Sequence, residues 1–357
     1  FAHEQRIEPY EVIDFSANIN PLGPSQRGLD ALNNQLRYIS HYPDATNDDV
    51  LNAIADTYGM DKNQIIVGNG AAELLYAICR LPGYTGAFVP APGFSEYKEA
   101  LEASNIPVRD IFYRPREDDN GKPYFEVPYL ALETFAAELK GQDGRIIVFL
   151  GNPNNPDGTL LDKAHIRTVA SMLKDANSLL VIDESFIDFV GNDPLRDNDQ
   201  SMRSLINEFD NIIVVHSFTK FYAVPGLRIG AAFGNKKVIS HLHQYIPSWS
   251  VNTLAQTYTE VALNDVDYIK RTKQELNEER AFMYNALDGI EGITVYPPSA
   301  NFILFKVNRE GITANTINEN LKKDNMIVRN CDSYVGLNNQ WVRIAIKDHD
   351  TNIKLVE

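Results

Sequence analysis

The feature that most constrains the fold is a series of short apolar runs that alternate with segments of helical periodicity. The runs cover residues 64–68, 86–90, 145–151, 178–183, 211–217 and 228–233. Helical periodicity separates them, for example over residues 161–174. This alternation predicts an α/β fold with a mostly parallel sheet covered on both faces. In open sheets of this kind, ligands bind at the carboxyl edge of the strands.

A chain of 357 residues is long enough for one large domain and a smaller one. We expect residues 1–36 to form an N-terminal arm that joins the small domain, and residues 37–250 to form the large domain. Residues 251–357 are expected to form a linking helix, over 251–287, and a small α+β domain. The elements expected in the small domain are strands 302–307 and 341–346 and helix 313–323.

Lys220 is the residue with the clearest chemical meaning. It ends the motif Ser217-Phe218-Thr219-Lys220 after an apolar run, and Arg228 follows eight residues later. Such a lysine can hold the aldehyde of pyridoxal phosphate as a Schiff base, while the hydroxyls and the guanidinium hold the phosphate. A lysine taken alone is more often a solvated surface group, so the interpretation depends on three further elements.

The first two are an acid and a run of small residues. Asp183 follows the apolar run 179–182, where a carboxylate can keep the pyridine nitrogen of the cofactor protonated. In isolation it would be a strand-end or helix-capping acid. Gly70, Ala71 and Ala72 begin a helix-like segment, and their backbone N–H groups can bind a phosphate. A dinucleotide-binding turn is excluded because the third glycine of its motif is Glu73 here.

The third element is Asn155, in the Asn/Pro/Gly turn 151–158 that follows another apolar run. Together the four elements resemble the fold-type I pyridoxal phosphate enzymes, the aspartate aminotransferase superfamily. Within it, the chain is most similar to the threonine-phosphate decarboxylases of cobamide biosynthesis, relatives of the histidinol-phosphate aminotransferases. The matching stretches are 14–23, 219–228 and 327–331, the last with Gly336 and Leu337 after it.

The resemblance implies an aspartate aminotransferase-like fold whose large domain binds pyridoxal 5′-phosphate. The residues it implies for cofactor binding are Gly70, Ala71, Ala72, Phe94, Asn155, Asp183, Ser217, Thr219, Lys220, Arg228 and, from a second subunit, Tyr42. Lys220 would be the Schiff-base lysine, Asp183 the partner of the pyridine nitrogen and Asn155 a donor to the 3-oxygen. Phe94 would stack on the ring. Tyr42 serving the neighbouring site implies a homodimer, although Phe94 and Tyr42 could also be ordinary packing residues.

For the substrate, the resemblance implies Asn18, Arg329 and Arg343 as binding residues. The related decarboxylases commonly begin with a His-Gly-Gly segment that contacts the substrate phosphate. This chain begins Phe1-Ala2-His3, so His3 is expected to be a remnant of that contact without the glycines.

The position three residues after Asp183 distinguishes two reactions. Aminotransferases of the superfamily usually carry tyrosine there, whereas this chain carries Phe186, as the decarboxylases do; neutral drift is the alternative explanation. The function that we expect is decarboxylation of L-threonine O-3-phosphate or L-serine O-phosphate to the amino alcohol phosphate. Arg343 and Arg329 would bind the substrate phosphate. The bond between Cα and the carboxylate would then stand perpendicular to the cofactor ring. Lys220, water or Tyr222 would return the proton.

Two other functions stay open at this point: histidinol-phosphate or a related aminotransferase, and a catalytically silent cofactor-binding module. A net charge of −15 argues against nucleic acid and anionic membranes as partners, and requires a local positive pocket for a phosphate. Apolar runs are far shorter than the ~20 residues of a membrane helix. Cys79 is expected in the core and Cys331 in the lining of the site, as a small apolar filler, and the histidines show no metal-ligand spacing. These features predict a cytoplasmic enzyme without a metal.

Overall fold

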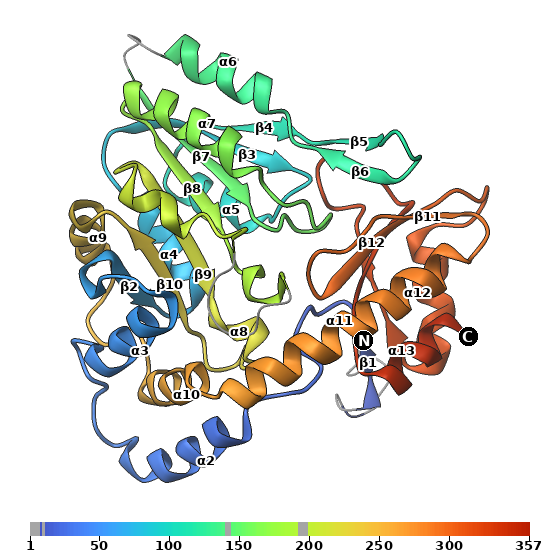
Figure 1. Cartoon of the computed structure of the whole chain (residues 1–357), viewed down its shortest axis with the longest axis horizontal. Helices are drawn as coiled ribbons and strands as arrows, with labels where there is room; N and C mark the ends of the chain where they lie inside the picture. The colour runs from blue at the N-terminus through green and yellow to red at the C-terminus, as the bar shows by residue number, and fades with distance from the viewer. Residues whose placement is uncertain (1–7, 9–10, 140–143, 192–198) are drawn as a thin grey trace.

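The computed structural model describes residue 8 and residues 11–139, 144–191 and 199–357. Its large domain is built on a seven-stranded sheet (Figure 1). In spatial order the strands are β2 (Ile65–Gly68), β10 (Gly230–Gly234), β9 (Ile212–Ser217), β8 (Leu179–Asp183), β7 (Arg145–Gly151), β3 (Tyr84–Ala91) and β4 (Val108–Phe112). Strand β10 runs opposite to the other six strands, which are parallel to one another. The prediction of a mostly parallel sheet is therefore confirmed.

Both faces of the sheet are buried. Successive side chains of each strand point to opposite faces, so each strand contributes to two apolar clusters. On β7, Val148 and Leu150 belong to one apolar cluster, whereas Ile147 and Phe149 belong to the other. The first cluster contains α7 (Lys163–Asp175), and the second contains α4 (Gly70–Cys79), α5 (Glu96–Ala103) and α9 (Lys236–Leu242). The other helices of this part are α3 (Asp48–Tyr58), α6 (Tyr129–Leu139) and α8 (Phe218–Phe221).

The small domain holds a four-stranded antiparallel sheet. In spatial order its strands are β11 (Ile293–Val295), β12 (Phe302–Val307), β15 (Trp341–Ala345) and β14 (Arg329–Asn330). Its helices are α12 (Ala314–Leu321) and α13 (His349–Val356). Strand β1 (Ile13–Asp14) pairs in parallel with β13 (Met326–Ile327), whereas the following helix α2 (Gln26–Gln35) packs on α10 (Thr253–Leu263). The domain bounds at residues 36 and 250 stay a prediction.

One predicted helix differs from the structure, and two observed features were not predicted. The expected helix 251–287 is interrupted, because Asp265 begins a new helix, α11 (Val266–Asp288), by accepting a hydrogen bond from the Tyr268 N–H. Strand β4 was not predicted, since Arg109 and Asp110 interrupt its apolar pattern at the sheet edge. The hairpin of β5 (Arg114–Glu117) and β6 (Pro123–Glu126) was not predicted either, because its first strand is fully exposed and charged.

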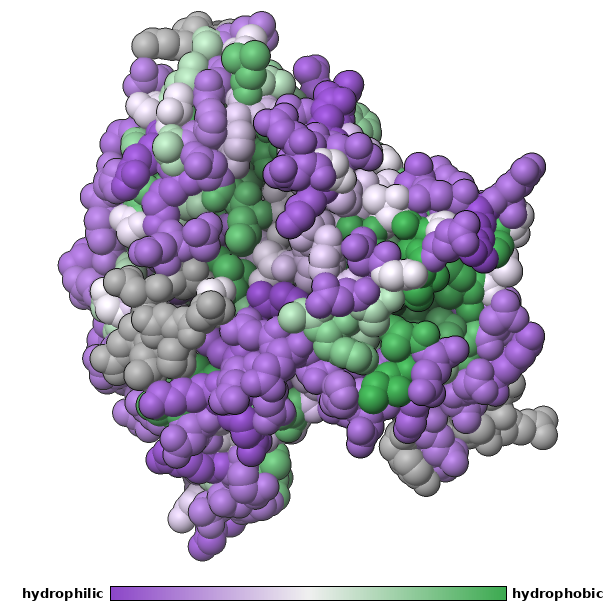
Figure 2. All heavy atoms as spheres, turned by 45° about the vertical axis from the view of Figure 1, so that its right-hand side comes forward, coloured by the Kyte–Doolittle hydropathy of each residue, from purple (hydrophilic) through white to green (hydrophobic). Residues whose placement is uncertain are grey.

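On the face shown in Figure 2, hydrophilic residues cover most of the surface. Within the described parts of the chain, no helix combines the length and apolar character needed to cross a bilayer. The same parts contain no group of three or more side chains suited to hold a metal ion.

Candidate active site

Three of the predicted residues meet where adjacent strands of the large sheet end. Asp183 is the last residue of β8, Asn155 follows β7, and Lys220 lies in the single turn of α8 that follows β9. Strands β7, β8 and β9 are neighbours in the sheet, so their carboxyl ends share one edge. The convergence that the sequence predicted is present in the fold.

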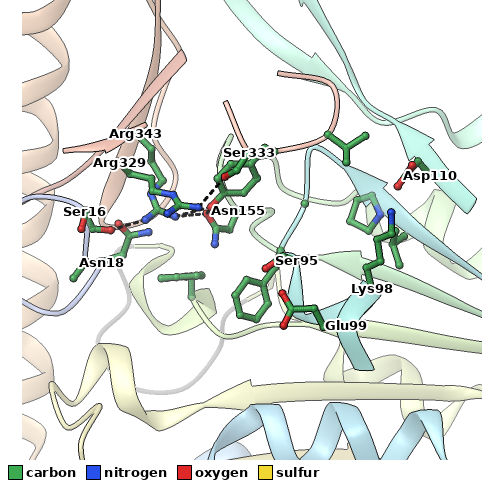
Figure 3. A pocket seen from close by; sticks show the side chains of 18 of the residues that line it. Ser16, Asn18, Ser95, Lys98, Glu99, Asp110, Asn155, Arg329, Ser333 and Arg343 are labelled. Carbon is green, nitrogen blue, oxygen red and sulfur yellow. Dashed lines mark hydrogen bonds between the residues drawn. The ribbon is translucent and has the colours of Figure 1, made fainter. Parts of the chain in front are cut away.

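A cavity of about 780 Å³ opens at this edge (Figure 3). The predicted residues that line it are Asn18, Phe94, Asn155, Phe186, Lys220, Arg329 and Arg343. Residues that were not predicted also line it, among them Ser16, Ser333, Tyr334, Lys98, Glu99 and Asp110. Figure 3 shows Arg329, Arg343 and Asn155 together at one end, and Lys98 and Asp110 at the other.

The amine of Lys220 is tuned by its surroundings. The pKa of Lys220 is lowered to about 8, chiefly by burial and also by the charge of Arg228, while the charge of Asp183 acts in the opposite direction. The amine lies 5.1 Å from the centre of the Phe186 ring. A lysine with a pKa this low is partly unprotonated near neutral pH, and the unprotonated amine is the form that attacks an aldehyde.

Two donors fix the carboxylate of Asp183, of which only 6% is exposed. The hydroxyl of Tyr97 donates to Oδ2 over 2.8 Å, and the backbone N–H of Ser185 donates to Oδ1 over 2.9 Å. Burial, and then the charge of Asp183, raise the pKa of Tyr97 well above its usual value, so its hydroxyl stays protonated. Sequence reasoning missed Tyr97, because it lies within α5 and offers no local motif.

The start of α4 forms a cradle with groups from other segments. Gly70 has a φ of +81°, and a Cβ there would collide with the guanidinium of Arg228. A Cβ on Gly230 would lie 2.6 Å from the backbone nitrogen of Ala71. The hydroxyls of Ser217 and Thr219 are 2.7 Å apart. The cradle thus combines backbone N–H groups at a helix start, two hydroxyls and a cation, which is a chemical match for a phosphate.

Arg343 is a buried cation at the other end of the cavity, with 6% of its surface exposed. It donates from Nη2 to the carbonyl of Ser16 over 2.6 Å, and from Nη1 to Oδ1 of Asn155 and, over 3.3 Å, to the hydroxyl of Tyr334. All three acceptors are neutral. Burial lowers the pKa of Arg343, as does the charge of Arg329. Among the described residues, no carboxylate forms an ion pair with Arg343 and its Nε has no hydrogen-bond partner.

Arg329 stands directly opposite Arg343 in the antiparallel pair of β14 and β15. It is exposed, donates to the Ser333 hydroxyl over 3.1 Å and lies over the Tyr334 ring at 5.5 Å. Like charges at directly opposed positions repel each other. An anion between them would remove this repulsion, so this end of the cavity is suited to an anionic group.

The other predicted residues take different positions. Asn18 is buried and its Oδ1 has no partner among the described residues, so it could receive a hydrogen bond from a ligand. Tyr42 is 80% exposed, does not line this chain's cavity and packs against Trp249 at 4.9 Å. His3 lies outside the described residues.

Two residues considered for the site do not line the cavity. Cys331 is fully buried in the apolar core, where burial raises its pKa to about 11, and it does not line the cavity. Tyr222 does not line it either, because its ring packs against Phe221 and Tyr268 inside the protein. This position argues against Tyr222 as a direct proton donor.

Comparisons with known proteins agree with this geometry. The family model for aminotransferase class I and II matches residues 10–357. The chain is 33% identical to the threonine-phosphate decarboxylase of Salmonella typhimurium, with 98% of this chain and 91% of that protein covered. It is 30% identical to the histidinol-phosphate aminotransferase of Methanothermobacter thermautotrophicus, with 97% and 88% covered.

Two further similarities extend these findings. An adenosylcobalamin biosynthesis bifunctional protein of Leptospira interrogans is 32% identical over 98% of this chain, which spans only 38% of that longer protein. The crystal structure of a histidinol-phosphate aminotransferase from Clostridium acetobutylicum superimposes with a TM-score of 0.85 at 26% identity, with 97% of each chain covered. The similar proteins thus carry two different activities on one fold.

Proposed function

We propose that the chain, which belongs to the aminotransferase class I and II family, decarboxylates a phosphorylated amino acid. The proposed substrate is L-threonine O-3-phosphate or L-serine O-phosphate, and the product would serve the nucleotide loop of a cobamide. The observation that carries the proposal is the pair of Arg329 and Arg343. They are opposed across two strands, and Arg343 is buried without an acidic partner among the described residues. A phosphate dianion can accept charge-assisted hydrogen bonds from both guanidiniums.

The cofactor of the protein is pyridoxal 5′-phosphate, and the residues of the site fit it. The cradle at Gly70, beside Arg228 and Ser217, would hold the phosphate, since a Cβ at Gly70 would displace the guanidinium. Asp183 would pair with the ring nitrogen, and Lys220 would bond to the aldehyde. When bound, the cofactor supplies an electron sink for the bond that breaks at the substrate Cα.

The proposed role of Arg329 and Arg343 is to determine which bond at the substrate Cα breaks. By its similarity to the aminotransferases of the family, Arg343 would match the arginine that binds the substrate carboxylate in those enzymes. If Arg343 and Arg329 hold the phosphate of the substrate instead, neither holds its carboxylate. The carboxylate is then free to turn towards the face of the ring, and its bond to Cα is the one positioned to break.

The proposed role of Lys220 Nζ is to return a proton to the substrate Cα. Its pKa of about 8 allows it to carry that proton near neutral pH and to give it up. Phe186 lines the cavity beside the amine without offering a hydroxyl. Together with Phe94 it would exclude water from the reacting carbon.

A direct assay distinguishes this proposal from its alternative, a histidinol-phosphate or related aminotransferase. Purified protein loaded with cofactor is given threonine phosphate or serine phosphate, and release of CO₂ is measured without any 2-oxo acid. We expect CO₂ and the amino alcohol phosphate in equal amounts. Turnover of histidinol phosphate that requires a 2-oxo acid, with no CO₂ released from either phosphoamino acid, would instead support the aminotransferase.

We also propose a homodimer in the cytoplasm, in which Tyr42 reaches the cofactor phosphate of the neighbouring site. Supporting this, Tyr42 is 80% exposed, and Leu36, Tyr38, Ile39 and Trp249 are exposed large apolar residues as well. Light scattering should give twice the mass of one chain, and Tyr42→Phe should weaken cofactor binding without changing the mass. A monomer with full cofactor affinity would exclude this arrangement.

A further inference from the structure

Asn20, in the Asn-Ile-Asn-Pro turn of the N-terminal segment, contacts the backbone of the turn that carries Lys220. Its own N–H donates to the Lys220 carbonyl over 3.0 Å, and its side-chain Nδ2 donates to the Phe221 carbonyl over 2.7 Å. Phe221 ends the four-residue helix α8, and its carbonyl accepts hydrogen bonds from the side chains of Asn20 and Tyr268. Asn20 therefore serves as an external cap for the lysine turn.

The side chain of Asn20 is also anchored to α11. Its Nδ2 lies 2.9 Å from the hydroxyl of Tyr268 and 2.9 Å from the hydroxyl of Thr272, and its Oδ1 accepts from the Leu22 N–H over 3.0 Å. Only 3% of Asn20 is exposed. Buried amides with this many partners have one orientation, because any rotation would leave polar atoms unpaired.

The same segment reaches the anion end of the cavity. The carbonyl of Ser16 accepts from Nη2 of Arg343, and the carbonyl of Phe15 accepts from the Ala345 N–H over 2.7 Å. Only a few residues therefore separate the contact with Arg343 from the contact with Lys220. In Figure 1 the long helix α11 passes beside α8 and continues towards the small domain.

We infer that Asn20 is a positioning residue, which holds the turn of Lys220 at a fixed place relative to the cavity and to α11. The inference rests on the role proposed above for Lys220, but not on the identity of the substrate. A displacement of about 1 Å at a reacting group can cost up to ~10²-fold in rate, so a cap that fixes this turn matters for turnover as well as for folding.

The test compares Asn20→Ala with Asn352→Ala. Asn352 is a matched control, because it is fully buried, makes three side-chain hydrogen bonds, to Glu279 and to the Lys347 backbone, and does not line the cavity. Three quantities are measured on each holoenzyme: thermal unfolding, kcat and KM, and the pH midpoint of the visible absorption of the bound cofactor.

Asn20→Ala should lower kcat about tenfold, with KM changed less than about threefold, and move the absorption midpoint by about one pH unit. Asn352→Ala should lower only the unfolding temperature. The inference is overturned if Asn20→Ala loses stability but keeps the wild-type kcat and midpoint, or if Asn352→Ala shifts both as strongly.

A second variant and a labelling experiment keep the result interpretable. If Asn20→Ala does not fold, Tyr268→Phe takes its place, because it removes only the hydroxyl that contacts Asn20 and the Phe221 carbonyl. Tyr268→Phe should shift the absorption midpoint by a smaller but measurable amount. An unchanged midpoint would refute the inference. Borohydride reduction and peptide mapping of the wild type come first. A label away from Lys220 would remove the premise, whereas a label at Lys220 without CO₂ release would remove only the proposed decarboxylation.

Discussion

Replacing Arg343 and Arg329 one at a time tests whether burial determines how much each arginine contributes to binding of the substrate anion. Arg343 is 6% exposed, so it would meet an anion in surroundings from which water is largely excluded. A hydrogen bond to a charged group contributes about 1.5–3 kcal/mol in such surroundings. At about 1.4 kcal/mol per factor of ten, Arg343→Ala should weaken substrate binding about 12- to 140-fold.

Arg329 is exposed, and its interaction is screened by water and salt. Exposed ion pairs contribute about 0.2–1 kcal/mol, so Arg329→Ala should weaken the substrate only about 1.4- to 5-fold. The remaining effect of Arg329 should also shrink between about 0.05 and 0.5 M salt, because the Debye length shortens over that range. The effect of Arg343 should depend much less on salt.

The assay is steady-state turnover of the phosphoamino acid, or substrate binding followed by the cofactor absorption, with cofactor affinity measured in parallel. Arg343→Ala also deprives Asn155 and the Ser16 carbonyl of a donor, so its unfolding temperature should fall as well. Arg343→Lys retains a cation and serves as the control for that loss, with part of the substrate affinity restored. The reasoning is refuted if cofactor affinity falls as far as substrate affinity, or if Arg329→Ala is the more damaging change.

Three further predictions concern the rest of the site and the core. In cofactor-free protein, the rate at which an amine reagent labels Lys220 should rise about tenfold per pH unit up to about 8 and then level off, because burial lowers its pKa; a continued rise to about 10.5 would contradict that shift. Gly70→Ala should weaken cofactor binding, since the new Cβ meets the Arg228 guanidinium; a cofactor affinity equal to that of the wild type would argue against the cradle. Burial alone would raise the pKa of Asp188, but His216 lowers it to about 2, so the stability this carboxylate provides is present above about pH 4 and lost as pH falls towards 2. Asp188→Asn should accordingly reduce the free energy of unfolding by about 1–3 kcal/mol at pH 7 and flatten that acid transition in denaturant titrations.

Local patterns in the sequence were sufficient for the main elements of the fold. Apolar runs of strand length gave the central strands, and β7 and β12 were predicted with their observed bounds. The edge strand β4 and the β5–β6 hairpin escaped prediction because exposed strands need not be apolar. The interruption between α10 and α11 also escaped, since it depends on one capping aspartate rather than on periodicity.

The sequence by itself determined which chemical groups stand at strand ends: an amine, an acid and an amide, each directly after a buried run. The tertiary structure decided what holds them. Tyr97 reaches Asp183 across 86 residues, Asn20 reaches the Phe221 carbonyl across 201, and Arg343 reaches the Ser16 carbonyl across 327. Periodicity reports only which side of an element is buried. A hydrogen bond between distant segments depends on how whole elements pack, and no stretch of sequence around either partner records it.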